Sequence, residues 1–141
     1  MATPRASPDH TSAERRFFMG MGLAILAAVA LGFSRSFFLR PLFPELPSPS
    51  ESIFYIHGVV FTAWIVLLVS QTSLIAGGRI ELHRRVGPFG AALAVAMVAI
   101  GTLGALIAAR RATGFVGIPV PPLQFLAIPI FDIALFAIFT W

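Results

Sequence analysis

Three side chains that could do chemistry lie inside long apolar stretches of this sequence: His57, Gln71 and Asp132. Burying an ionisable or strongly polar group costs free energy unless it finds a partner, so each is a candidate functional residue. Trp64 lies seven residues from both His57 and Gln71, a spacing that places all three on one face of a helix. We predict that this face points inward. It could hold a cofactor or relay protons; alternatively, His57 bonds a loop carbonyl and Gln71 a neighbouring helix.

Asp132 follows Pro129, which removes one backbone hydrogen bond and is expected to bend its helix. At that depth we expect the carboxyl group to be paired or protonated, with an Arg at another helix end or His57 as the partner. Structural pairing is the simpler interpretation. An unpaired carboxyl group would favour a proton-relay role.

His57 and His83 are the candidate cofactor ligands, because membrane cytochromes of the b type hold haem between helices through axial histidines. The two are 26 residues apart, about 39 Å along a continuous helix, so they cannot ligate one iron. The other apolar stretches contain no histidine, and His10 precedes them all. A haem b site would therefore need ligands outside this chain or from a second copy. Taken alone, His83 more simply belongs to an Arg-rich turn that faces lipid headgroups.

Other kinds of site lack their residues. The chain contains no Cys, which excludes a disulfide, a thiolate metal site and thiol chemistry. It also lacks Gly-x-Ser-x-Gly, His-Glu-x-x-His, a phosphate-binding glycine loop and two carboxylates in one apolar stretch. We predict no catalytic residue and no metal site, and the sequence favours a protein that is not an enzyme.

The elements that must position these residues are four apolar stretches, at 17–34, 53–77, 86–109 and 123–141. A hydrocarbon core of about 30 Å needs roughly 20 apolar residues in a helix. A chain in lipid must satisfy its backbone hydrogen bonds internally, and the alternating polarity of barrel strands is absent. The sequence therefore predicts an all-α integral membrane four-helix bundle at 17–141, after a polar tail at 1–16.

The charges agree with a membrane protein. Hydrophobic residues make up 57% of the chain and charged residues 11%, and all ten basic residues are Arg. They flank the apolar stretches as topological anchors, so the lipid bilayer is the predicted partner and nucleic acid is not. A second copy or other membrane subunits are further candidate partners. Six arginines lie on one side and four on the other: Arg5, Arg15, Arg16, Arg79, Arg84 and Arg85 against Arg35, Arg40, Arg110 and Arg111. This bias places the N-terminus in the cytoplasm, at the inner (plasma) membrane of a bacterium.

The third stretch is predicted to be the central packing helix, because it carries pairs of small residues four apart that let another helix approach closely. These pairs are Gly90/Ala94, Ala92/Ala96, Gly101/Ala105 and Gly104/Ala108. The charged segment 77–85 before it is short, and Pro88 is placed in the first turn of the helix, where its missing N–H costs nothing. Stretches two and three should form a tight antiparallel hairpin.

Several phenylalanines lie at the two ends of the first stretch. They are Phe17, Phe18, Phe37, Phe38 and Phe43. We interpret them as lipid-facing and interface residues rather than as a ligand site.

A resemblance adds to this picture. His57-Gly58, Gln71, Gly78-Arg79, Leu82-His83-Arg84 and Gly87 resemble the signature of an uncharacterised family of bacterial multi-pass membrane proteins with a domain of unknown function. In that signature an early helix carries His, and the next turn reads His-Arg-x-x-Gly. The resemblance implies a longer protein with further helices and a later His-Lys-Arg turn. This chain ends at Trp141 before such a turn, so we expect it to be the N-terminal part of a larger bundle. The family is loosely reminiscent of four-helix b-type cytochromes.

The sequence leaves three functions open. The first is a structural or accessory membrane protein whose polar groups hold the bundle together. The second is a haem-binding or redox-associated membrane protein that uses His57 and His83. A transporter or proton-relay component is the weakest of the three functions. Asp132 is the only acidic group within an apolar stretch, and the sequence does not clearly show two interrupted helices in corresponding positions.

Overall fold

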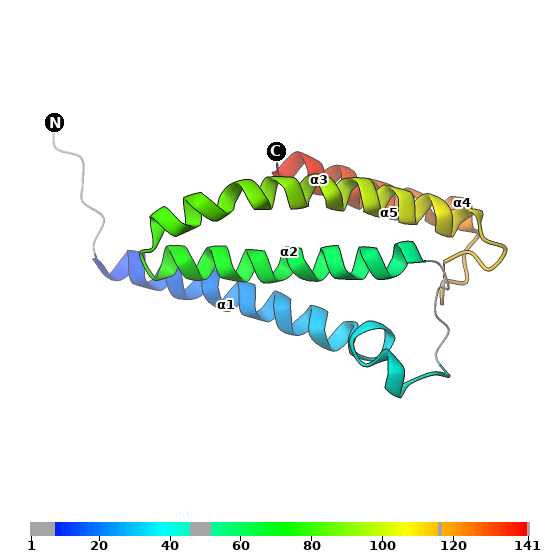
Figure 1. Ribbon diagram of the computed structural model, residues 1–141, viewed down its shortest axis with the longest axis horizontal. Coiled ribbons are helices and arrows are strands. Elements are labelled where there is room, and N and C mark those ends of the chain that lie inside the picture. Colours follow the sequence, from blue (N-terminus) through cyan, green and yellow to red (C-terminus); the bar gives the residue numbers. More distant parts are fainter. Residues whose placement is uncertain (1–7, 46–51, 116, 141) are drawn as a thin grey trace.

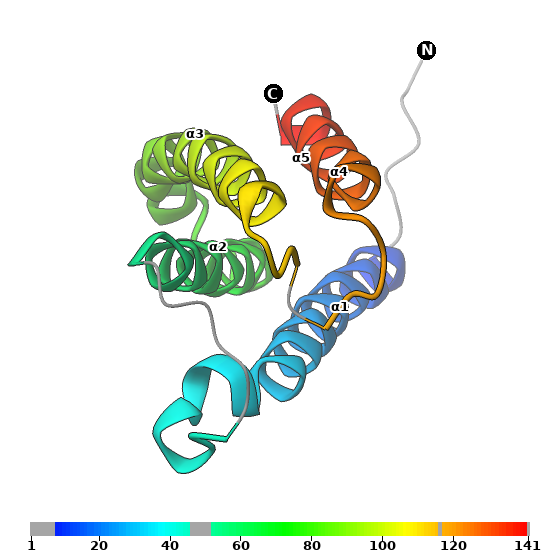
Figure 2. The same cartoon turned by 90° about the vertical axis from the view of Figure 1, so that its right-hand side faces the viewer.

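The computed structural model describes residues 8–45, 52–115 and 117–140, with side chains from Ser12 onward, and all regular structure in these ranges is helical. Two long helices, α2 (Ser52–Ala76) and α3 (Ile80–Arg110), form an antiparallel hairpin. The helix α1 (Pro8–Gly32) packs on α2, and the short α4 (Pro122–Phe125) and α5 (Ala127–Thr140) pack on α3. Figure 2, which looks roughly along the helices, shows α1, α2, α3 and α5 following one another around the bundle; Figure 1 shows the same helices from the side. The predicted all-α bundle is confirmed.

Four segments of the described chain are long and apolar enough to cross a membrane: Ser12–Gly32, Ser52–Ala76, Ile80–Arg110 and Pro122–Thr140. The bundle also has the surface that lipid requires. Buried apolar side chains are few among the described residues, whereas large ones such as Phe139 (82% exposed) and Leu123 (77% exposed) face outward. A water-soluble protein rarely exposes apolar surface so widely. These features are consistent with a membrane location.

Helix α1 begins nine residues before the predicted start at Phe17, so part of the predicted polar tail is helical. Pro8 is its first residue, a position where the fixed φ of proline favours a helix and its missing N–H costs nothing. Hydropathy identifies the part of a helix that can lie in lipid. It does not detect a polar extension of the same helix. Of the tail, residues 1–7 lie outside the described chain, and Arg5 with them.

The turn between α2 and α3 is shorter than the predicted segment 77–85. The Gly78 N–H donates to the Ile75 carbonyl at 3.0 Å and the Arg79 N–H to the Leu74 carbonyl at 2.8 Å. Gly78 has a φ of +72°. This is the glycine-dependent end of a helix known as a Schellman motif, and it lets α3 begin at Ile80. The predicted tight hairpin is therefore present, but residues 80–85 belong to its second helix.

The early start of α3 changes the role of Pro88. The sequence placed this proline in the first turn, but it lies in the interior of α3, where it leaves the Arg84 carbonyl without its helical N–H partner. An interior proline bends a helix, and Figure 1 shows α3 curving over α2. The prediction that Pro88 costs no hydrogen bond was wrong.

The fourth apolar stretch is divided at Leu126, between α4 and α5. Pro129 accounts for the break, because it cannot donate to the carbonyl of Phe125, four residues earlier. Leu126 itself keeps helical dihedral angles (φ −54°, ψ −29°), so the break is local and the predicted bend stays a prediction. The predicted last residue of the fourth apolar stretch, Trp141, lies outside the described chain.

Helix α3 is the packing centre of the bundle, as its small residues predicted. It contacts both α2 and α5, and it holds the buried residues of the described long helices other than Gly22. They are Met97, Gly101, Gly104, Ala105 and Ala108. A Cβ atom on Gly101 would lie 3.3 Å from the Ile133 side chain of α5, and one on Gly90 would lie 3.2 Å from Leu67 of α2. The absence of side chains at these positions lets the neighbouring helices pack closely.

Candidate functional site

The predicted inward face of α2 faces the bundle: His57, Trp64 and Gln71 are all half-buried. Each meets a different neighbour. The ring of Trp64 lies edge-on to Phe136 of α5, with 5.1 Å between centroids. Gln71 bonds His83, and His57 borders a cavity described below. The seven-residue spacing therefore identified the correct face, and it did not show that its three residues are in separate environments.

Gln71 and His83 form a two-point clamp between α2 and α3. The Gln71 Nε2 donates to the backbone carbonyl of His83 at 3.4 Å, and the Gln71 Oε1 lies 2.6 Å from the His83 Nδ1. A carbonyl only accepts, so the amide nitrogen must face it and the amide oxygen must face the ring. The His83 Nδ1 therefore carries a proton and donates it to Gln71. This bonding is the interhelical alternative that the sequence left open for Gln71.

The hairpin also sets the distance between the two histidines. Because α2 and α3 are antiparallel, His83 lies beside Gln71, which is fourteen residues from His57 on the same helix. Fourteen residues of helix span roughly 21 Å, in place of about 39 Å along one continuous helix. Imidazole nitrogens bind metals at about 2 Å, so the two side chains cannot share one iron. The structure does not bring the two predicted cofactor ligands together.

His57 lies in an aromatic environment. Its ring stacks on Phe61, one helical turn further along α2, with 4.0 Å between centroids and an interplanar angle of 23°. Neither ring nitrogen has a hydrogen-bond partner among the described residues, so the predicted bond to a loop carbonyl is not found there. An imidazole without a partner in an apolar setting can still bind a ligand.

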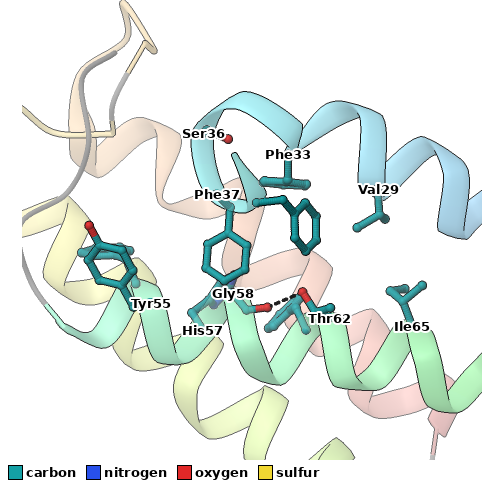
Figure 3. A pocket seen from close by; sticks show the side chains of 12 residues that line it. Val29, Phe33, Ser36, Phe37, Tyr55, His57, Gly58, Thr62 and Ile65 are labelled. Carbon is teal, nitrogen blue, oxygen red and sulfur yellow. Dashed lines mark hydrogen bonds between the residues drawn. The ribbon is translucent and has the colours of Figure 1, made fainter. Parts of the chain in front are cut away.

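A cavity of about 290 Å³ opens beside His57, between the end of α1 and the beginning of α2. Figure 3 shows Phe33 and Phe37 projecting toward α2, and Val29 and Ile65 at the end away from His57. The lining is almost entirely apolar. It consists of Val29, Phe33, Ser36, Phe37, Phe38, Phe54, Tyr55, His57, Gly58, Phe61, Thr62 and Ile65. The Thr62 hydroxyl is occupied, because it donates to the Gly58 carbonyl at 2.7 Å.

Two local features shape this cavity. The turn η1 (Ser34–Phe38) is a π-helix, in which the Phe38 N–H reaches back five residues to the Phe33 carbonyl at 3.1 Å. Such turns are rare and are often found at functional sites. It is followed by a short 3₁₀ turn, η2 (Arg40–Leu42). On the opposite wall, a Cβ atom on Gly58 would overlap the ring of Phe37, so only glycine lets this ring lie directly on α2.

The interpretation of the phenylalanines was wrong in part. Phe37 is half-buried and its ring packs on Gly58 of α2, although it was assigned to lipid and interface contacts; Phe38 also borders the cavity but is 42% exposed, as the interpretation expected. Phe17 and Phe18 are 62% and 55% exposed, as expected of lipid-facing residues. The sequence shows Phe33 and Phe37 four residues apart, but the position of Phe37 opposite Gly58 depends on the local structure of residues 34–38, so this spacing alone did not indicate the cavity.

Asp132 lies on the outer surface of α5 and is exposed. It has no hydrogen bond or ion pair with any described residue, so the expected pairing with an Arg or with His57 is not found in this part of the chain. An exposed carboxyl group within an apolar segment is costly in lipid. Asp132 is therefore separate from the groups on α2.

Arginines at the helix ends contact aromatic rings. The guanidinium of Arg111 lies 4.2 Å from the ring centroid of Phe54, a cavity residue, and that of Arg35 lies 4.7 Å from the ring of Phe43. Such contacts hold a cation beside an apolar surface. At the other end of the bundle, Arg85 pairs with Glu81 at 2.6 Å, both largely exposed. These three of the predicted anchoring arginines therefore lie near helix ends.

Comparison with protein families, with curated proteins and with solved structures gave no match.

Proposed function

We propose that this chain is a multi-pass membrane protein with a structural or accessory role, in which intramembrane polar groups hold helices together. The clamp between Gln71 and His83 is the observation that supports this role most directly. In this clamp, two of the predicted functional side chains bond to each other across the α2–α3 hairpin. Polar bonds of this kind stabilise helix association in lipid.

We place the protein in the bacterial inner membrane with its N-terminus in the cytoplasm. The antiparallel order of the helices puts the start of α1 and the turn at 77–79 at one end of the bundle, and the connections after α1 and α3 at the other (Figure 1). The first end carries the larger number of arginines. The positive-inside rule assigns that end to the cytoplasm.

A haem-associated role for His57 and His83 remains a prediction from the sequence, and the separation of the two side chains weakens it. Each would need an axial partner from outside the described residues. Transport or proton relay has less support, since Asp132 is bonded to neither His57 nor Gln71 and the described residues contain no continuous chain of polar groups.

An absorbance spectrum separates these roles. The full chain is expressed with haem supplied, purified in detergent, and measured beside the His57→Ala variant. An accessory protein gives a colourless preparation. A Soret band that disappears in His57→Ala would contradict the proposal and establish haem binding at His57.

A further inference from the structure

The cavity beside His57 has the features of a binding site that the clamp does not require. Ligand sites are mostly apolar, with a few polar groups that fix the orientation of the ligand. Here the ring of His57, which has no hydrogen-bond partner in the described part of the chain, is that polar group, and Phe33, Phe37 and Phe61 provide flat apolar surfaces. This site is about 21 Å along α2 from Gln71, so the two can be tested independently.

The size of the cavity limits the ligand. Ligand pockets in proteins commonly measure about 300–1,000 Å³, and at 290 Å³ this cavity is at the lower end of that range. One substituted six-membered ring is of this size.

The depth of the cavity limits the ligand further. Helix α2 has 25 residues and is about 37 Å long, so a hydrocarbon core of about 30 Å covers all but its ends. Seven residues separate His57 from the middle of α2, which places it about 4 Å inside the core boundary. Val29 and Ile65 lie toward the middle of the bilayer (Figure 3). A ligand would therefore hold its polar atoms at His57 and extend its apolar part toward the bilayer centre.

We propose that this cavity binds the ring of a lipid-soluble carbonyl compound of the isoprenoid quinone class, with His57 donating a hydrogen bond to a ring oxygen. The phenylalanines stack on or enclose the ring. The isoprenoid chain leaves past Val29 and Ile65 into the lipid. Phe37, held on Gly58, forms one wall of the site.

Binding of decylubiquinone tests the proposal. The full chain carries Trp141→Phe, so that Trp64 on α2 is its only tryptophan, and it is reconstituted in phospholipid nanodiscs. Saturable quenching of Trp64 fluorescence gives a Kd. We expect His57→Leu to raise the Kd about tenfold, the effect of one lost hydrogen bond. His57→Gln should have a smaller effect because its amide keeps a donor.

Two further variants complete the test. Ile65→Trp, with its binding followed by calorimetry, should abolish binding because its side chain fills the apolar end of the cavity. Ser70→Ala is the control, since its hydroxyl only bonds the Val66 carbonyl on the exposed side of α2, and it should leave the Kd unchanged. Helical circular dichroism confirms that each variant folds. Quenching that does not saturate, or a Kd that neither His57→Leu nor Ile65→Trp changes, would overturn the proposal. A Soret band dependent on His57 would also overturn it.

Discussion

At the residue scale, the polar groups on α2 have different roles although they share one face. Gln71 is engaged on both sides of its amide, whereas His57 stacks on Phe61 and has no hydrogen bond to any residue that the structure describes. The sequence could predict the shared face because helical periodicity alone determines it. It could not predict the partner of Gln71, because that depends on α3 beginning at Ile80 rather than at Val86.

The clamp gives the first prediction. Gln71→Leu and His83→Leu should each lower the free energy of unfolding by roughly 1–2 kcal/mol, since each leaves a half-buried polar group unpaired. The double variant should cost less than the sum of the two single variants. Reversible unfolding in mixed micelles, followed by circular dichroism, measures all three. Additive losses would show that the two side chains do not interact.

Asp132 gives the second prediction. Replacing this exposed carboxyl group by Leu should raise the melting temperature in nanodiscs, because a carboxylate within an apolar segment costs about 2–3 kcal/mol. Thr140→Leu, at the end of α5, is the control and should have a smaller effect. A lower melting temperature for Asp132→Leu would mean that the carboxyl group has a stabilising partner outside the described residues.

At the element scale, hydropathy identified each of the long helices but misplaced several of the residues at which they begin. The polar start of α1 and the first turns of α3 are helical although their residues are charged. The Schellman motif at Gly78 was visible in the sequence as two successive glycines after an apolar run. The π-turn at 34–38 was not, because no composition signal distinguishes it from the helix that precedes it. The cavity it shapes was therefore missed.

The packing of α3 gives the third prediction. Gly101→Leu should destabilise the bundle by roughly 1–3 kcal/mol, because its side chain would meet Ile133 and Phe61. Gly20→Leu is the matched control, since nothing lies within 4 Å of a Cβ atom at that position on α1. Thermal unfolding in the same detergent compares the two. Equal stability of both variants would contradict the central position of α3.

At the scale of the whole molecule, the proposed membrane location requires that the four long segments cross a bilayer in alternating directions. The supporting features are their length, their apolar composition and the exposure of large apolar side chains around the bundle. Lipid contact explains why so few apolar residues are buried, since helices in membranes need no apolar core of the kind that water imposes.

Cysteine labelling tests this claim most directly, because the chain contains no Cys and each introduced thiol is unique. Single cysteines replace Ala13, Arg79, Leu42 and Thr113, all exposed and outside or at the ends of the spanning segments. An impermeant maleimide added to spheroplasts should label positions 42 and 113. Positions 13 and 79 should react only in inverted vesicles. Labelling of all four positions from the same side of the membrane would contradict the alternating topology of the four segments.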